Sequence, residues 1–125
     1  MPDEAGIWIV GLVLLLAGAV LLVVGRKQRA GTLRRNRLVG LRTPQTLRSD
    51  AAWYAAHEGT AGLVATAGMV QILAGTAMLI LQPTGDGAIV LGAAAVTVGL
   101  VLTAGFRGDR IAESVNEGES AGPPD

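Results

Sequence analysis

The stretch GLRTPQTLRSDAAWYAAH, residues 40–57, brings charged, hydroxyl, aromatic and imidazole side chains together in a chain that is otherwise mostly apolar. Its proline disfavours helical geometry in the preceding Thr43, which predicts a turn there. Ser49 can cap a following helix, and Asp50 would place its carboxylate at the positive end of that helix. Because an uncharged apolar segment begins at Gly59, we expect this stretch to lie at a membrane surface.

Three apolar segments surround this stretch. Residues 5–25, 59–82 and 88–106 contain no Asp, Glu, Lys or Arg. At about 1.5 Å per helical residue the first segment reaches roughly 31 Å, which is enough to cross a bilayer. The helices of a soluble bundle would each show a charged face, and these segments show none. The sequence therefore predicts an all-α, integral membrane three-helix bundle with a structured loop between its first two helices.

The first apolar segment also invites comparison with a secretory signal peptide. Such a peptide carries positive charge before its apolar run and a small-residue cleavage site after it. Here the acidic residues Asp3 and Glu4 come first and the basic run RKQR, residues 26–29, comes after. We therefore expect the segment to be retained as a membrane helix.

The charges are distributed unevenly along the chain. All ten Lys and Arg lie in residues 26–58 or just after the third apolar segment, at Arg107 and Arg110. Cytoplasmic loops of membrane proteins carry an excess of Lys and Arg. We expect residues 1–4 and the turn at 83–87 outside the cell, and the basic loop 26–58 in the cytoplasm. The polar residues 107–125 would form a disordered, acidic cytoplasmic tail, although Ile111 and Val115 could prolong the third helix by a turn or two.

Glycines recur at seven-residue intervals within the apolar segments. This spacing places each set on one stripe of its helix, and small residues allow close helix packing in lipid. We expect a tightly packed, left-handed, antiparallel bundle, although glycine could simply be abundant in this chain. Gln71, near the middle of the second segment, would donate or accept a hydrogen bond across helices. The predicted packing residues are Gly11, Gly18, Gly25, Gly68, Gln71, Gly75, Gly85, Gly92 and Gly99.

The chain offers little material for catalysis or metal binding. It has one histidine, His57, and no cysteine, so a zinc site would need three more ligands from sparse carboxylates. We expect no catalytic residue, no metal and no cofactor, and hence no enzyme. His57 is expected to be a structural or interfacial residue, with a proton-sensing switch as the alternative.

Aromatic and basic residues of the loop admit several interpretations. Trp53 and Tyr54 fit the aromatic belt of a membrane interface, or Trp53 packs over Arg42 as a cation–π pair. Arg42 or Arg48 would pair with Asp50. The remaining basic residues set the topology or contact anionic lipid headgroups; with little aromatic interleaving, they do not indicate nucleic-acid binding.

One ordered set of residues runs through this stretch and its flanks: Asn36, Gly40, Arg42, Thr43, Thr46, Ser49, Trp53, His57 and Gly62. The pattern resembles the signature of the SdpI family, small multi-helix membrane proteins named for immunity to a secreted sporulation-delaying toxin peptide. The resemblance covers roughly residues 34–62. It implies a partner-binding motif, which with the neighbouring Asp50 comprises Asn36, Gly40, Arg42, Thr43, Thr46, Ser49, Asp50, Trp53 and His57, followed by Gly62.

Three functional hypotheses follow. The resemblance implies a non-enzymatic, multi-pass protein of the bacterial cell membrane, in which the loop binds a cytoplasmic regulator or the protein protects against a toxin peptide. The glycine stripes and small size also suit an accessory or scaffold subunit of a larger membrane complex. A third hypothesis is a protein that handles lipids, with the loop arginines holding anionic headgroups.

Overall fold

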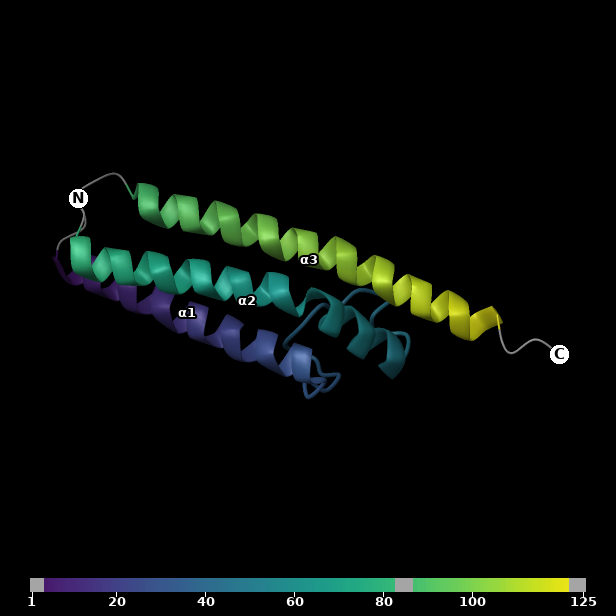
Figure 1. Ribbon diagram of the computed structural model, residues 1–125. Helices are drawn as coiled ribbons and strands as arrows, with labels where there is room; N and C mark the ends of the chain where they lie inside the picture. The colour runs from purple at the N-terminus through teal and green to yellow at the C-terminus, as the bar shows by residue number, and fades with distance from the viewer. Residues whose placement is uncertain (1–3, 83–86, 122–125) are drawn as a thin grey trace.

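The protein consists of three long helices. The computed structural model describes residues 4–82 and 87–121, and within them the helices are α1 (Glu4–Ala30), α2 (Asp50–Leu81) and α3 (Ala88–Ala121) (Figure 1). Each helix is long and apolar enough to cross a membrane. The predicted all-α fold with three membrane helices is confirmed.

The helices lie in a row with α2 in the middle (Figure 1). Helix α2 packs against α1 on one side and α3 on the other, and within the described residues α1 and α3 make no contact. The close packing predicted for the bundle is therefore found between α1 and α2 and between α2 and α3. Because α1 and α3 each contact a single helix, both leave most of their apolar side chains exposed at the surface, as lipid-facing helices do.

Glycines allow α1 and α2 to approach closely. A Cβ on Gly18 would lie 2.7 Å from the carbonyl oxygen of Gly68, and one on Gly68 would lie 2.9 Å from the carbonyl oxygen of Gly18. Gly11 and Gly75 face each other in the same way seven residues along, with a Cβ on Gly75 lying 2.8 Å from the Gly11 carbonyl oxygen. Any side chain at these positions would push the two backbones apart.

The glycines of α3 behave differently. Gly92 and Gly99 are exposed, and a Cβ on either would meet no atom within 4 Å. Their predicted role in packing was wrong, because the seven-residue repeat of α3 lies on a face turned away from α2. Within the apolar segment of α3, the side chains buried beside α2 are instead Ala93 and Ala104. The predicted Gly85 lies outside the described residues.

Helix α3 continues far beyond its apolar segment. The predicted disordered tail was wrong for residues 107–121, which are helical; residues 122–125 lie outside the described residues. The reason is an apolar stripe at helical spacing that contains Ile111, Ala112 and Val115. Ala112 is fully buried together with Ala52 and Ala56 of α2, so the tail gains a small core of its own.

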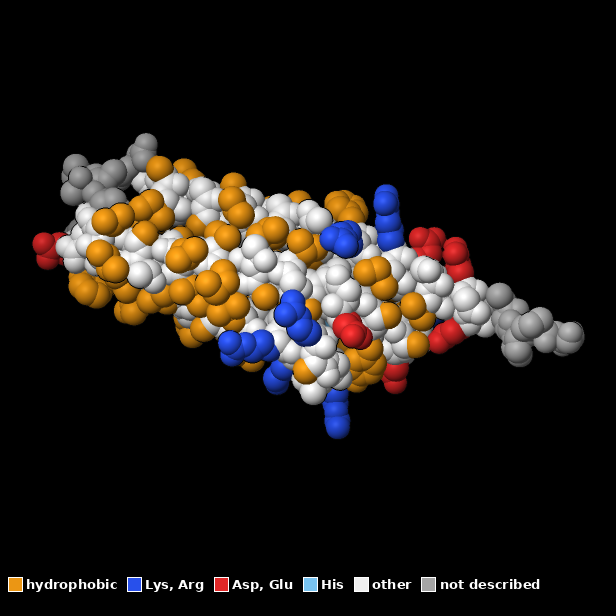
Figure 2. All heavy atoms as spheres, viewed as in Figure 1, with side chains coloured by type: hydrophobic (Ala, Val, Ile, Leu, Met, Phe, Trp, Pro, Cys, Tyr) orange, Lys and Arg blue, Asp and Glu red, His pale blue; other side chains and the backbone are white. Residues whose placement is uncertain are grey.

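The two ends of the molecule differ in chemistry. The loop 31–49 and the end of α3 lie at one end, and the start of α1 lies at the other (Figure 1). Figure 2 shows hydrophobic side chains over the half of this face away from the loop, with Lys and Arg side chains gathered at the boundary toward the loop end. Most of the residues predicted to lie outside the cell, 1–4 and 83–87, are not among those that the structure describes, because residues 1–3 and 83–86 are not described.

Candidate functional site: a folded cap at the end of the helices

The loop between α1 and α2 is folded against both α2 and α3. We call this unit the cap and define it as the loop residues 31–49, the first turns of α2 (50–60) and the last turns of α3 (108–120). Its hydrogen bonds come from the loop's own turns, from the start of α2 and from Asn116 of α3.

A glycine ends α1 and turns the chain back. Gly31 has φ +70°, its N–H donates to the Gln28 carbonyl at 3.3 Å, and the Thr32 N–H donates to the Lys27 carbonyl at 2.9 Å. This pair of bonds is the Schellman arrangement, in which a left-handed residue satisfies the last carbonyls of a helix. Leu33, two residues after Gly31, is buried.

Asn36 holds the tip of the loop. Its Oδ1 accepts hydrogen bonds from the backbone N–H groups of Leu38 at 2.9 Å and Val39 at 2.8 Å, and its Nδ2 donates to the Arg34 carbonyl at 2.7 Å. A short amide side chain that binds the backbone two or three residues on is a common way to fix a turn. All these polar atoms are used within the loop, so Asn36 has a structural task.

Thr43 and Thr46 close the predicted turn on each other. The Thr43 Oγ1 accepts from the Thr46 N–H at 3.2 Å, and the Thr46 Oγ1 accepts from the Thr43 N–H at 2.9 Å. The reciprocal pattern is that of a capping box, with Pro44 at the first position of the turn. The buried Thr46 hydroxyl also lies 2.8 Å from the Leu41 carbonyl, to which it donates.

Ser49 begins α2 as predicted. It has extended backbone angles and its hydroxyl accepts from the Ala52 N–H at 3.1 Å. Asp50 lies in the first turn, where a carboxylate is favoured by the helix dipole. The Asp50 carboxylate pairs with Arg35 at 3.4 Å on the surface. The predicted partners Arg42 and Arg48 are therefore wrong.

The centre of the cap is a stack of two rings. Trp53 and His57 are both buried, with ring centroids 4.1 Å apart, and the Trp53 indole N–H donates to the Leu33 carbonyl at 2.8 Å. Gly40 lies over them with φ +110°, and a Cβ there would be 2.5 Å from the His57 Nε2. Only glycine allows the loop to come this close.

His57 connects the loop to α2. The Leu41 N–H donates to the His57 Nε2 at 2.8 Å, so that nitrogen carries no proton. The proton is on Nδ1, which faces the Trp53 carbonyl at 2.6 Å. His57 precedes the uncharged segment of α2, and its burial lowers its pKa below 6.5, while the hydrogen bond to Trp53 raises the pKa by a smaller amount. The imidazole is therefore neutral when the cap is closed, that is, when the bond between Leu41 and His57 is formed.

Two expectations for Trp53 and Arg42 were wrong. Trp53 has no exposed surface, so it belongs to the interior of the cap and not to an aromatic belt. Its ring partner is His57, and Arg42 instead donates from its guanidinium to the carbonyl of Arg37. The indole fills the space below the loop, which leaves no face for a cation.

Asn116 was not among the residues selected from the sequence. It is buried, and its Nδ2 donates to the Gln45 carbonyl at 2.9 Å and to the Gln45 Oε1 at 3.0 Å. Its Oδ1 accepts from the Ser49 hydroxyl at 3.3 Å. These bonds tie the end of α3 to the loop. The only sequence signal is its position one helical turn after Ala112, on the buried stripe.

The structure thus brings Gly40, Thr46, Trp53 and His57 together around Leu41, with Thr43 and Ser49 closing the adjacent turns. The polar side chains of Asn36, Arg42 and Asp50 instead bind other groups of the protein at its surface. The predicted motif is therefore mainly the framework of the cap, and few of its polar atoms are free for a ligand.

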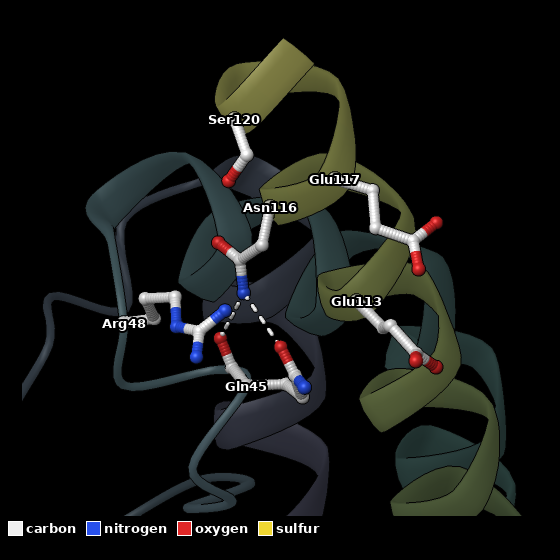
Figure 3. A pocket seen from close by; sticks show the side chains of 6 residues that line it. All are labelled: Gln45, Arg48, Glu113, Asn116, Glu117 and Ser120. Carbon is white, nitrogen blue, oxygen red and sulfur yellow. Dashed lines mark hydrogen bonds between the residues drawn. The ribbon is translucent and has the colours of Figure 1, made fainter.

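Two hollows open beside this framework. One is a polar pocket of about 340 Å³ where the loop meets the end of α3. Asn116 and Gln45 lie in its middle, joined by hydrogen bonds (Figure 3). The side chain of Arg48 lies on one side of them, and the carboxylates of Glu113 and Glu117 lie on the other (Figure 3). The other hollow is an apolar groove of about 430 Å³ between α1 and the loop tip.

Among residues 4–82 and 87–121, no group of three His, Cys, Asp or Glu side chains could hold a metal ion. The buried imidazole of His57 has both nitrogens engaged with the protein, so in this arrangement it does not offer a ligand or a base to a substrate.

Comparison with known proteins identifies the family. The family model described as the SdpI/YfhL protein family matches residues 32–106, which take in most of the cap together with the apolar parts of α2 and α3. No curated protein and no solved structure matches the chain. The match covers more than half of the chain and includes every residue of the predicted motif, and the chain therefore belongs to the SdpI/YfhL family.

Proposed function

We propose that this protein is a non-enzymatic, multi-pass protein of the bacterial cell membrane, with the cap in the cytoplasm and the start of α1 outside. The distribution of charge supports this orientation, because all ten Lys and Arg belong to the cap end of the molecule. Since the chain has no cysteine, single-cysteine variants report topology without background.

The orientation is tested by labelling with a membrane-impermeant maleimide. Ala5→Cys and Arg48→Cys place a thiol at exposed positions at the two ends. We expect labelling of Ala5→Cys in intact cells and of Arg48→Cys only in inverted vesicles. Labelling of Arg48→Cys in intact cells would refute the proposed orientation.

We infer that the cap is a docking surface for a cytoplasmic protein, as the family resemblance to toxin-immunity and signalling proteins suggests. One observation carries this inference. The polar pocket is lined by Arg48, Glu113 and Glu117, and within the described residues none of these three charged side chains takes part in an ion pair. Unpaired charges of both signs around an open pocket suit a partner that presents complementary charges.

Charge reversal within the pocket tests the inference. Arg48→Glu and Glu113→Lys change the charge of the pocket without touching the buried rings, and Glu119→Lys is a matched control on an exposed part of α3 outside the pocket. In a bacterium sensitive to a membrane-active toxin peptide of the sporulation-delaying type, we expect the two pocket variants to lose protection at unchanged abundance. We expect the control to protect like the wild type. Full protection by both pocket variants would contradict docking at this pocket.

An accessory role in a larger membrane complex is the second candidate. The observation that favours it is the face of α3 that bears Gly92 and Gly99, which contacts no other helix in the described structure. Purification in mild detergent separates the two candidates. Stoichiometric membrane partners, lost when Gly92 and Gly99 are both changed to Leu, would favour the subunit, whereas a lone protein that still protects cells would favour the first proposal.

A further inference from the structure

The apolar groove between α1 and the loop tip has the chemistry of a lipid site. Its walls are α1 side chains on one side and loop side chains on the other: Ala19, Val20, Val23, Val24 and Lys27, facing Leu33, Asn36, Leu38 and Val39. We propose that this groove binds one phospholipid with an anionic headgroup from the leaflet on the cap side. An acyl chain would lie along α1, with the phosphate at Lys27.

The length of the groove along α1 supports an acyl chain as the occupant. Eight residues separate Ala19 from Lys27, which corresponds to about 12 Å along the helix axis. Before Lys27 the α1 wall consists of Ala19, Val20, Val23 and Val24, which belong to the uncharged segment 5–25. The end of the groove at Ala19 therefore lies at the level of acyl chains, and the rim at Lys27 lies at the level of headgroups.

The loop tip contributes exposed apolar side chains to the same groove. Leu38 is 91% exposed and Val39 is 38% exposed, although both follow a run of basic residues. Large apolar side chains in a basic loop are unfavourable in water and favourable against acyl chains. Asn36 holds both residues in place through their backbone N–H groups, so the groove is formed before a ligand arrives. Asn36 is thus a positioning residue for this site.

Charge at the rim selects the headgroup. The described residues contain one ion pair, between Arg35 and Asp50, so the Lys27 ammonium has no carboxylate partner there. Arg34 and Arg37 are exposed in the adjoining loop. A long basic side chain at a helix end extends its ammonium to the headgroup level, where an anionic lipid is favoured over a zwitterionic one by about fivefold for each basic residue.

Lipid retention measured by native mass spectrometry tests the proposal. The purified full chain is equilibrated with equal amounts of phosphatidylglycerol and phosphatidylcholine. Lys27→Gln removes the rim charge, and Arg26→Gln is its control, because Arg26 is exposed beside it and does not line the groove. Ala19→Phe fills the groove, and Ala17→Phe is its control on an exposed position outside the groove.

We expect one phosphatidylglycerol retained per chain, about fivefold weaker binding in Lys27→Gln, and loss of the bound lipid in Ala19→Phe with both controls unchanged. Equal retention of the two lipids would overturn the proposal, as would equal loss in a variant and its control. Displacement of the lipid by inorganic phosphate alone would show a simple anion site and would also overturn it. Retention of a second protein copy in place of lipid would assign the groove to self-association instead.

Discussion

The backbone N–H of Leu41 and the Nε2 of His57 are 2.8 Å apart, and this hydrogen bond fastens the middle of the loop to the start of α2. Its direction fixes the protonation of the ring, because an accepting Nε2 cannot carry a hydrogen. Protonating His57 would set two N–H groups against each other beneath Gly40. Closure of the cap is therefore tied to the neutral imidazole.

This link predicts that the cap opens in acid. Burial lowers the pKa of His57 in the closed cap below 6.5, the value expected once the ring is released. The open state then binds more protons, so the stabilisation is complete above pH 6.5 and is lost as the pH falls from 6.5 toward the lowered pKa. We expect amide exchange at Leu41, corrected for its intrinsic pH dependence, to accelerate over this range. His57→Gln should abolish the pH dependence. Equal protection above and below pH 6.5 in the wild type would show that the ring does not control closure.

Gly40 should tolerate no side chain. Gly40→Ala places a Cβ 2.5 Å from the His57 Nε2 at φ +110°, and such backbone strain costs on the order of 1–3 kcal/mol before the ring is displaced. Gly31→Ala is the control, since φ is +70° there and no atom lies within 4 Å; it should cost about 1 kcal/mol. Unfolding of the cap is followed by Trp53 fluorescence in a Trp8→Phe background. Equal losses of cap stability in Gly40→Ala and Gly31→Ala would mean that the clash with the rings adds no cost to the backbone strain.

The glycines of α1 and α2 should be sensitive to substitution, and those of α3 should not. Gly18→Ala and Gly68→Ala each drive a methyl group into the opposite backbone, at 2.7 Å and 2.9 Å, and should lower thermal stability in detergent. Gly92→Ala and Gly99→Ala meet open space. They should be neutral or stabilise the helix by about 0.5–1 kcal/mol each. Larger losses of stability in the α3 variants than in the α1 and α2 variants would show that the glycines of α1 and α2 do not form the helix contact.

Asn116 should hold the end of α3 on the loop. Asn116→Ala removes the bonds to Gln45 and Ser49 and leaves their polar groups without this partner, which costs about 1–3 kcal/mol. Ser114→Ala, at an exposed position two residues earlier, should change little. Limited proteolysis of the last turns of α3 is the measurement. Cleavage at equal rates in both variants would show that these bonds do not restrain the helix.

Much of this fold could be predicted from the sequence because the relevant signals are local. Uncharged segments long enough to cross a bilayer gave the three helices, and Ser49 with Asp50 gave the start of α2. The glycine repeat identified stripes correctly but did not reveal which stripe faces a neighbour. On α1 and α2 it coincides with the contact, whereas on α3 the contact runs through Ala93 and Ala104.

Other features depend on contacts distant in sequence. The polar composition of residues 107–121 concealed a narrow buried stripe around Ala112, because composition averages over all faces of a helix. Asn116 lies 71 residues from Gln45 and could not be paired with it beforehand. The motif could be found from residue identities alone. Identity does not show whether a His or Trp side chain packs inside the protein or binds a partner. Only the geometry assigns His57 and Trp53 to the interior of the cap.

Residue-resolved amide exchange of the protein in lipid nanodiscs at neutral pH tests most directly whether the loop and the end of α3 form one folded cap. We expect slow exchange at Leu41, Thr46 and Leu47 in the loop and along α3 from Ala112 to Ser120. Asn116→Ala should release both segments together. If residues 41–47 and 112–120 exchanged at the rate of an unfolded chain, the folded cap would not exist, and the placement of the motif residues would be contradicted.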